Sequence, residues 1–431
     1  MKKVSKFEKN IKNTKISALK RGKCGYALTK TEKDCIIGNG MALQNAKEVF
    51  MEKQIYFDHA ATTPLDKEVL NKMLPYFTDV YGNADSPHAL GRKAMNAVDE
   101  ARCAFAEEIG AKANEVYFTS GGTESGNWAI RCGAYAKKAE GRTHIAVSAI
   151  EHHAVKETAA ALEKEGFLVS WIPVNEGGRV EMESVKACIN ANTGLIAVMA
   201  ANNETGVLQP IEEIAALAHE NGSLFFTDAV QYAPYKAIDV KELGVDFLSV
   251  SAHKFYGPKG CGALYIKSGI KVQNLIIGGE QERGLRGGTV NVPSVVGLSE
   301  AYKKNKATMS ESNEKIKDLR DLFLSQISCV EGVFVNGDLE NALPSVLNLR
   351  IDGVENAAFL YNMDLKGVCL AAGSACASAS IKPSHVLTAM GLEEKQAKSS
   401  VRISFGKNNT KEEVLRATEL FVETIGRLRK F

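Results

Sequence analysis

DFLSVSAHK (residues 246–254) is followed by FYGPKG (255–260), and the predicted architecture rests on this segment. An apolar run rich in strand-forming residues ends in Ser-Ala-His-Lys, and the chain then turns at Gly257 and Pro258. This pattern predicts a strand that delivers Lys254 from its carboxyl end. The ordinary alternative is a surface lysine that closes a strand, because lysine rarely enters a protein interior.

A second strand with the same design precedes the first. SLFFTD (223–228) is an apolar run that ends on Asp228, and Gln231 follows three residues later. Two strands ending on Asp228 and Lys254 fit an enzyme that holds a pyridine ring. The lysine would supply a Schiff base, and the carboxylate would keep the ring nitrogen protonated so that the ring withdraws electrons.

Outward from these strands, helical and apolar strand patterns alternate. Strands are expected at 116–119, 145–148, 168–173, 195–201, 224–228, 247–250 and 263–266, and helices at 122–138, 154–165, 181–191 and 211–220. The alternation predicts an α/β fold with a mainly parallel sheet covered by helices on both faces. Ligands of such sheets collect at the carboxyl ends of the strands.

The flanking segments complete the predicted organisation. Helices are expected at 67–80 and 90–109, and a long helical stretch from 292 through 320. Shorter strands at 345–351 and 401–405 and a final helix from 411 indicate a second, smaller α/β domain. We therefore expect a large domain at 66–299 and a small C-terminal domain at 300–431, with residues 51–65 packing against the small one.

Composition limits the functional class. The 431 residues are 45% hydrophobic and 24% charged, as in soluble globular proteins, and no apolar run is long enough to span a membrane. Residues 1–50 carry a net charge of +8 and the remainder −6, so the main body is not expected to bind nucleic acid. Nine scattered cysteines without a Cys-x-x-Cys pair indicate free thiols in a reducing compartment.

Residues 1–50 form a basic, Lys-rich extension. A disordered arm, an organelle-targeting segment and residues upstream of the true start are the alternatives. Transit peptides are typically Arg-rich and poor in acids, unlike this segment. We expect an extension without a catalytic role, with Met51 as a candidate initiator and a cytoplasmic location.

Two loops contain groups suited to a phosphate and a ring. TSGGTES (119–125) joins a strand to a helix start, whose N–H groups and dipole attract an anion; an ordinary N-cap is the alternative. Ser251 and the run GGEQERGLRGGT (278–289) could complete the anion site. EHH (151–153) and NNETG (202–206) also follow strands, so an imidazole over the ring and an amide at a ring hydroxyl are plausible; capping residues are the alternative.

Two further residues have chemistry of their own. Cys376 lies in AGSACASAS (372–380), a run of small residues that suits an exposed thiol, whereas Cys369 lies in an apolar run typical of a buried cysteine. An inert cysteine among alanines is the alternative for Cys376. Arg402 alternates with apolar neighbours in SVRIS (400–404) and suits a carboxylate clamp or a buried ion pair.

These motifs occur together in one order, from FDHAATTP (57–64) through SGGTES, NNETG, Asp228 with Gln231, SAHK and GSAC. In this order they resemble the NifS/IscS-type cysteine desulfurases over about residues 54–431. The resemblance implies a fold-type I homodimer with a seven-stranded main sheet that uses pyridoxal 5'-phosphate (PLP) to take sulfur from L-cysteine and leave L-alanine.

The resemblance also implies roles for individual residues. Lys254 would carry the cofactor and move the Cα proton, Asp228 would pair with the ring nitrogen, and His152 would stack on the ring and assist proton transfer. Cys376 would attack the substrate sulfur and become a persulfide. The other implied contacts are Gln231 and Asn203 at the ring oxygen, Gly122, Thr123, Ser251 and His253 at the phosphate, Thr289 at the partner subunit's phosphate, and Asn83 and Arg402 at the substrate carboxylate.

Some positions depart from the family pattern, namely Ala252, Gly126, Ala377 and Lys407. None of them removes a group that the chemistry needs. A selenocysteine lyase or an aminotransferase of the same fold, and an inactive sulfur-carrier subunit, are the alternatives. The expected partner is a sulfur-acceptor protein, either an iron–sulfur scaffold or a tRNA-thiolation enzyme, with no metal, membrane or direct nucleic-acid contact.

Overall fold

The computed structural model describes residues 54–373 and 383–430. The backbone groups into two units, residues 1–54 and 55–431, and every helix and strand named below belongs to the second unit. The predicted extension at 1–50, Met51 and Cys376 lie outside the described residues.

Seven strands form the main sheet, in the order β2-β8-β7-β6-β5-β3-β4. β8 is antiparallel to both of its neighbours, and the other adjacent pairs are parallel. The predicted α/β class with a mainly parallel seven-stranded sheet is confirmed. The strands are β2 (Val116–Thr119), β3 (His144–Ser148), β4 (Leu168–Ile172), β5 (Thr193–Ala197), β6 (Leu224–Asp228), β7 (Phe247–Ser251) and β8 (Gly262–Ile266).

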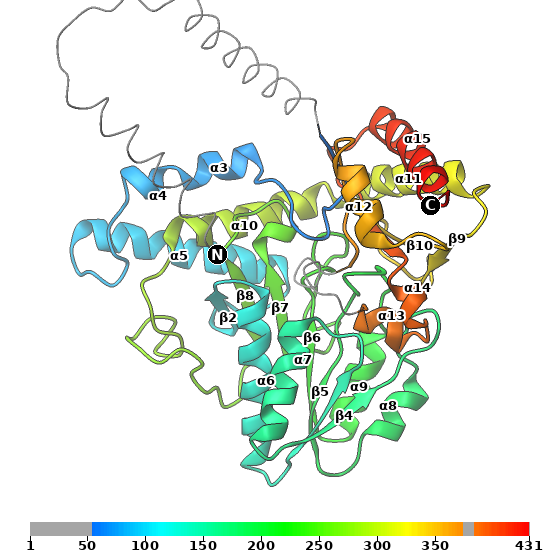
Figure 1. The fold of residues 1–431 in the computed structure, drawn as a ribbon. Coiled ribbons are helices and arrows are strands. Elements are labelled where there is room, and N and C mark those ends of the chain that lie inside the picture. The colour runs from blue at the N-terminus through cyan, green and yellow to red at the C-terminus, as the bar shows by residue number, and fades with distance from the viewer. Residues whose placement is uncertain (1–53, 374–382, 431) are drawn as a thin grey trace, which may run out of the picture. The chain divides into compact units, whose positions relative to one another are not determined.

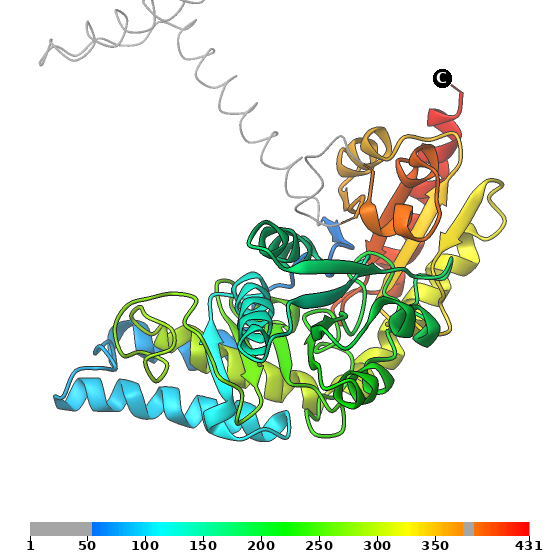
Figure 2. The same ribbon diagram turned by 90° about the horizontal axis from the view of Figure 1, so that it is seen from below.

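Successive strand residues point to opposite faces of this sheet, and each face has its own apolar core. In β3, Ile145 and Val147 pack with α6 (Gly122–Lys138) and α7 (His153–Lys164). Ala146 belongs to the other core, with α5 (Ala89–Glu108), α8 (Met182–Cys188), α9 (Ile211–Glu220) and α10 (Val292–Ala307). Figures 1 and 2 show these helices around the sheet, with α5 beside α10.

A second sheet of three antiparallel strands follows in the C-terminal part, in the order β12-β10-β9. Its core includes residues of α11, α12 and α15. α15 begins with a capping box, in which Thr410 and Glu413 satisfy the first free N–H groups. The elements are β9 (Val333–Asn336), β10 (Val346–Ile351), β12 (Ser400–Ser404), α11 (Met309–Ile327), α12 (Asn356–Asp364) and α15 (Lys411–Leu428).

The first described residues run alongside this C-terminal part. β1 (Ile55–Tyr56) pairs in parallel with β11 (Val368–Cys369), and Asp58 forms a bridge with Ser404 of β12. The short elements are η1 (Ala113–Glu115), η2 (Ala252–Lys254), α13 (His385–Ala389) and α14 (Glu394–Ala397). The division into domains at 66–299 and 300–431 stays a prediction.

Two predicted helices are interrupted. The expected helix at 67–80 is α3 (Lys67–Met73) followed by α4 (Pro75–Thr78), because Pro75 has no N–H and starts a new turn. The expected stretch from 292 through 320 is α10 followed by α11, with the break at Thr308.

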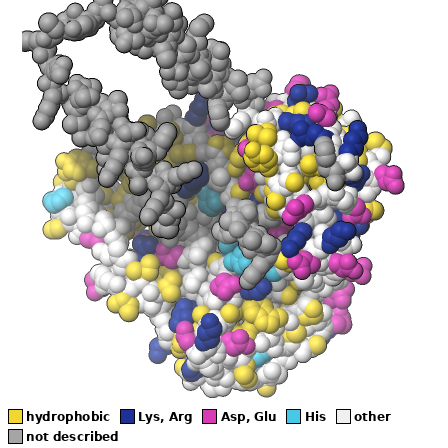
Figure 3. Space-filling view, in the orientation of Figure 1, with side chains coloured by type: hydrophobic (Ala, Val, Ile, Leu, Met, Phe, Trp, Pro, Cys, Tyr) yellow, Lys and Arg dark blue, Asp and Glu magenta, His cyan; other side chains and the backbone are white. Residues whose placement is uncertain are grey.

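Two surface properties bear on the expected partners. Across residues 54–373 and 383–430, no helix is long and apolar enough to cross a membrane. On the face shown in Figure 3, Lys and Arg side chains are interspersed with Asp and Glu side chains. The expectation that this protein contacts no nucleic acid directly stays a prediction.

Candidate active site

A cavity of about 200 Å³ lies at the carboxyl ends of the central strands of the main sheet. Ten of the predicted site residues line it, and they come from segments far apart in the sequence. They are Gly122, Thr123, His152, Asn203, Asp228, Gln231, Ser251, His253, Lys254 and Arg402. Their convergence is what the strand-end argument predicted.

Lys254 reaches the cavity from η2, one short turn beyond β7. Its Nζ donates to the backbone oxygens of Ala60, at 2.6 Å, and Ala61, at 2.8 Å. The amine is therefore held from the opposite side by the segment that follows β1. Backbone oxygens are present at every residue and cannot be recognised as acceptors from residue type. The sequence therefore predicted the lysine but not these two partners.

Asp228 ends β6 and is buried. Its Oδ1 accepts hydrogen bonds from the Val230 N–H, at 2.9 Å, and the Ser249 hydroxyl, at 3.2 Å. Burial raises the pKa of this carboxyl group, while the neighbouring His152 and Lys254 lower it. A protonated ring nitrogen would compensate this buried charge, so the site fits the pyridine of PLP.

His152 is the N-cap residue of α7, and its Nδ1 accepts a hydrogen bond from the Ala154 N–H at 3.1 Å. A neutral ring with this contact carries its proton on Nε2. Burial is the main cause that lowers the pKa of His152. At neutral pH the ring is therefore uncharged and can lie flat against an aromatic cofactor.

The α6 N-terminus provides a place for a phosphate. The N–H groups of its first turn have no partner within the helix and carry the positive end of the dipole. No side chain caps this end, and a Cβ at Gly122 would lie 2.7 Å from the Val230 Cγ2. Ser251 and His253 line the same cavity. The open first turn fits an anion such as the PLP phosphate.

His253 is fixed by a contact with the N-terminal segment. Its Nδ1 lies 3.1 Å from the Thr62 hydroxyl. Burial, with smaller contributions from Lys254 and Lys259, lowers its pKa to about 4. The ring is neutral at pH 7 and can contribute hydrogen bonding, but not a positive charge, to an anion.

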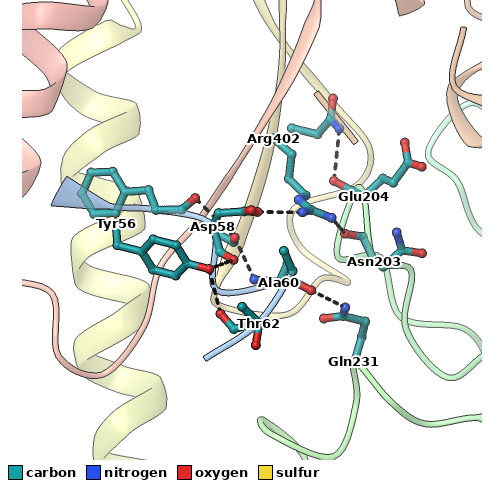
Figure 4. A network of polar contacts seen from close by, with 12 residues as sticks. Tyr56, Asp58, Ala60, Thr62, Asn203, Glu204, Gln231 and Arg402 are labelled. Carbon is teal, nitrogen blue, oxygen red and sulfur yellow. Dashed lines mark hydrogen bonds and ion pairs between the residues drawn. The ribbon is translucent and has the colours of Figure 1, made fainter. Parts of the chain in front are cut away.

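One wall of the cavity is a polar network (Figure 4). The Arg402 Nη1 donates to the Asn203 backbone oxygen, and its Nη2 pairs with Asp58 Oδ1, both at 2.8 Å. The Gln231 Nε2 donates to the Ala60 oxygen at 2.9 Å. The motif at 57–64 was recognised in the sequence, but no role was predicted for Asp58.

Three predicted site residues are not part of this cavity. Asn83 and Thr289 are exposed, and neither lines the cavity of its own chain. Asn83 Oδ1 instead accepts a hydrogen bond from the Asp85 N–H at 3.0 Å. Cys376 lies outside the described residues. The roles predicted for these three residues stay predictions.

The fold and the cavity together define a PLP-dependent enzyme. A strand-end lysine, a buried carboxylate, a neutral histidine and an uncapped helix start meet in one space. The chain belongs to the aminotransferase class-V family, whose profile matches residues 55–416.

Curated relatives and solved structures narrow this class. Over 383 residues the chain is 46% identical to a cysteine desulfurase IscS of Clostridium botulinum, covering 88% of this chain and 96% of the relative. It is 45% identical over 377 residues to a cysteine desulfurase IscS of Methanosarcina thermophila, covering 88% and 93%. A solved NifS-like protein superimposes with a TM-score of 0.82 at 34% identity, covering 87% and 100%.

Proposed function

We propose that this PLP-dependent cysteine desulfurase moves the sulfur of L-cysteine onto Cys376 and then to an acceptor protein. The observation that carries the proposal is the single cavity in which Lys254, Asp228 and His152 meet beside an anion-binding helix start. The net first half-reaction is L-cysteine plus the Cys376 thiol giving L-alanine plus a Cys376 persulfide. One C–S bond and one S–H bond break, and one S–S bond and one C–H bond form.

The residues that would hold the cofactor are those whose chemistry fits it. Lys254 would bind it covalently, Asp228 would pair with its ring nitrogen, and His152 would lie on its ring. The first turn of α6, with Ser251 and His253, would hold its phosphate. When bound, PLP supplies an electron sink that makes the Cα–H bond of an amino acid easier to break.

Lys254 is also the group placed to move a proton. An amine accepts a proton only in its neutral form, and moving an ammonium group from water into a partly enclosed site favours that neutral form. The oxygens of Ala60 and Ala61 fix the nitrogen in position, which keeps its distance to a bound amino acid constant.

Arg402 and Cys376 would act on the two ends of the substrate. The buried guanidinium of Arg402 is suited to the substrate carboxylate. The Cys376 thiolate would attack the substrate sulfur, and the electron pair of the broken C–S bond stays with the carbon part, which gains a proton to become alanine. A thiolate is required because the thiol is a weak nucleophile.

We also propose a homodimer in which Thr289 serves the partner's cavity, because this residue is exposed and lies outside its own. The acceptor would be an iron–sulfur scaffold or a tRNA-thiolation enzyme. A cytoplasmic location is proposed because the six cysteines within the described ranges are free thiols.

The test is turnover of L-cysteine by the purified holoenzyme with a thiol reductant. We expect equal amounts of alanine and sulfide, and a persulfide on Cys376 detectable by mass spectrometry before reductant is added. The matched variant is Cys376→Ser, which should keep the colour of the bound cofactor and lose sulfide release. Holoenzyme that produces neither alanine nor sulfide would contradict the assignment.

A further inference from the structure

Arg402 lines the cavity as a buried cation, and not all of its N–H donors have an acceptor among the described residues. Its side chain is 1% exposed. A guanidinium has five N–H donors, and those of Arg402 contact the Asn203 backbone oxygen and Asp58 Oδ1. Within the described residues its Nε has no acceptor. A buried cation of this kind is suited to one more anionic partner.

The backbone of Asp58 is fixed against β12, the strand that carries Arg402. Asp58 bridges to Ser404, two residues beyond Arg402 in β12. The Phe57 oxygen accepts from the Ser404 N–H at 2.8 Å, and the Asp58 oxygen accepts from the Tyr56 hydroxyl at 3.0 Å. The Asp58 carboxylate therefore meets Arg402 with little backbone freedom (Figure 4).

The two members of this ion pair differ in exposure. The Asp58 side chain is 20% exposed and retains contact with solvent, whereas Arg402 is enclosed. A long side chain without such a partner would have several rotamers to occupy at the cavity wall. The geometry indicates that Asp58 selects one Arg402 rotamer. In this rotamer Nη1 and Nη2 donate to protein oxygens, and Nε has no acceptor among the described residues.

We propose that Asp58 is a positioning residue that determines specificity for amino acids with a free carboxylate, by holding the Arg402 guanidinium in the orientation that receives that carboxylate. This inference rests on the proposed role of Arg402 in substrate binding. Asp58 itself does not touch the substrate. Its effect is confined to ligands that carry a carboxylate, and it is absent for amines that lack one.

Two ligands and two substitutions test this inference. L-Alanine and ethylamine differ by one carboxylate, and both can be titrated into the holoenzyme by the visible absorbance of its bound cofactor. For Asp58→Ala we expect the dissociation constant of L-alanine to rise about tenfold or more and that of ethylamine to change less than about twofold, since only the charge-assisted contact to Arg402 is disturbed.

Asp58→Asn removes the negative charge at this position but keeps an oxygen that can accept the hydrogen bond from Arg402. Its amide oxygen can still accept from the Arg402 Nη2, so we expect L-alanine to bind within about threefold of wild type. In turnover, Asp58→Ala should raise KM for L-cysteine with kcat little changed, because orientation of the carboxylate site affects binding. The matched control is Asp66→Asn, which removes a carboxylate paired with Lys304 at 2.9 Å outside the cavity lining.

Several results would overturn the inference. Equal weakening of both ligands would mean that Asp58 supports only the fold, and unchanged L-alanine binding in Asp58→Ala would mean that it positions nothing. Loss in Asp58→Asn as large as in Asp58→Ala would exclude holding by an acceptor oxygen. Arg402→Ala distinguishes failure of the proposed carboxylate site from failure of the Asp58 inference. If Arg402→Ala binds L-alanine like wild type, Arg402 does not bind the carboxylate. If Arg402→Ala weakens L-alanine binding and Asp58→Ala does not, Arg402 binds the carboxylate but Asp58 does not position it.

Discussion

Glu151 is a buried acid next to His152, one of the residues that line the cavity. It is 0% exposed, and its Oε1 accepts from the Ser148 hydroxyl and the Met199 N–H, both at 2.6 Å. Burial raises its pKa to about 8, and Asp228 adds to the increase. A protonated Glu151 places no second negative charge near Asp228, which is consistent with the proposed pairing of that carboxylate with the ring nitrogen.

This protonation predicts how stability depends on pH. The folded pKa of Glu151 is about 8 and its ordinary value is 4.5. Between these values the folded chain keeps a proton that the unfolded chain releases. The contribution of this group is therefore complete below pH 4.5 and is lost as the pH rises through 8, by at most about 1.4 kcal/mol per pH unit.

Urea unfolding of the holoenzyme at pH 6 and pH 8 checks this prediction with Glu151→Gln. Gln can accept the same two hydrogen bonds but binds no proton. The free energy of unfolding of wild type, relative to that of the variant, should therefore decrease from pH 6 to pH 8. Glu163→Gln, at an exposed position of α7, is the control and should show no such change. Parallel pH profiles for wild type and Glu151→Gln would refute the assignment.

For single residues, the sequence predicted which side chains share the site but not the contacts that hold them. Lys254 and Asp228 could be predicted to share a site because strand ends of a parallel sheet meet at one edge. The acceptors of the Lys254 amine are backbone oxygens of Ala60 and Ala61, which no residue type indicates. Asp58 belongs to a recognised motif, but its contact with Arg402 depends on a pairing between residues more than 300 positions apart.

At the scale of elements, local signals predicted some boundaries well. The helix expected at 122–138 is α6 with the same bounds, and the helix expected from 411 is α15, which starts at its capping box. β9 was not predicted, since a four-residue strand carries too little pattern to be recognised. Its place is determined by pairing with β10, which is a tertiary contact.

Two glycines in different elements should respond to the same substitution in opposite directions. Gly426 lies inside α15, and an added Cβ would meet no atom within 4 Å. Gly426→Ala should stabilise the protein by about 0.5–1 kcal/mol because alanine loses less backbone entropy in a helix.

At Gly262 of β8, an added Cβ would lie 2.6 Å from the Val250 oxygen and 2.7 Å from the Gly121 Cα. Neither backbone atom can move alone, so Gly262→Ala should destabilise the protein by about 1–3 kcal/mol. It should also weaken cofactor retention, because Gly121 precedes the anion-binding start of α6. The free energy of unfolding from denaturant titration measures both substitutions, and a shift of the same sign for both would contradict the argument.

At the scale of the whole molecule, the N-terminal segment links the parts that form the site. Residues 55–58 pair with β11 and β12 in the C-terminal part, and the Ala60 oxygen accepts from Gln231 and Lys254, which follow β6 and β7 of the main sheet. Arg402 comes from β12 and Asp228 from β6. The cavity therefore depends on both sheets being correctly placed. A change that displaces the Ala60 backbone should weaken cofactor binding, whereas loss of the Asp58 side chain should affect only the carboxylate site.

A homodimer in which each cavity uses residues of both chains predicts that two inactive variants can restore activity when they form a mixed dimer. If Thr289 serves the partner's cavity, Lys254→Ala and Thr289→Asp damage different sites when they lie on different chains. In a mixed dimer, one cavity would combine both defects, and the other would have an intact Lys254 from one chain and an intact Thr289 from its partner. Co-expression of the two variants with different tags, followed by purification through both, yields this mixed dimer.

We expect each variant alone to release little alanine from L-cysteine. Lys254→Ala lacks the amine, and Thr289→Asp places a carboxylate where a phosphate would bind. The doubly tagged dimer should recover about half of the wild-type activity per dimer, since one of its two sites is intact. If Thr289 instead acted within its own chain, both cavities of the mixed dimer would be defective and no activity would return. A chain that runs as a monomer in light scattering would yield no doubly tagged species and would contradict the shared site directly.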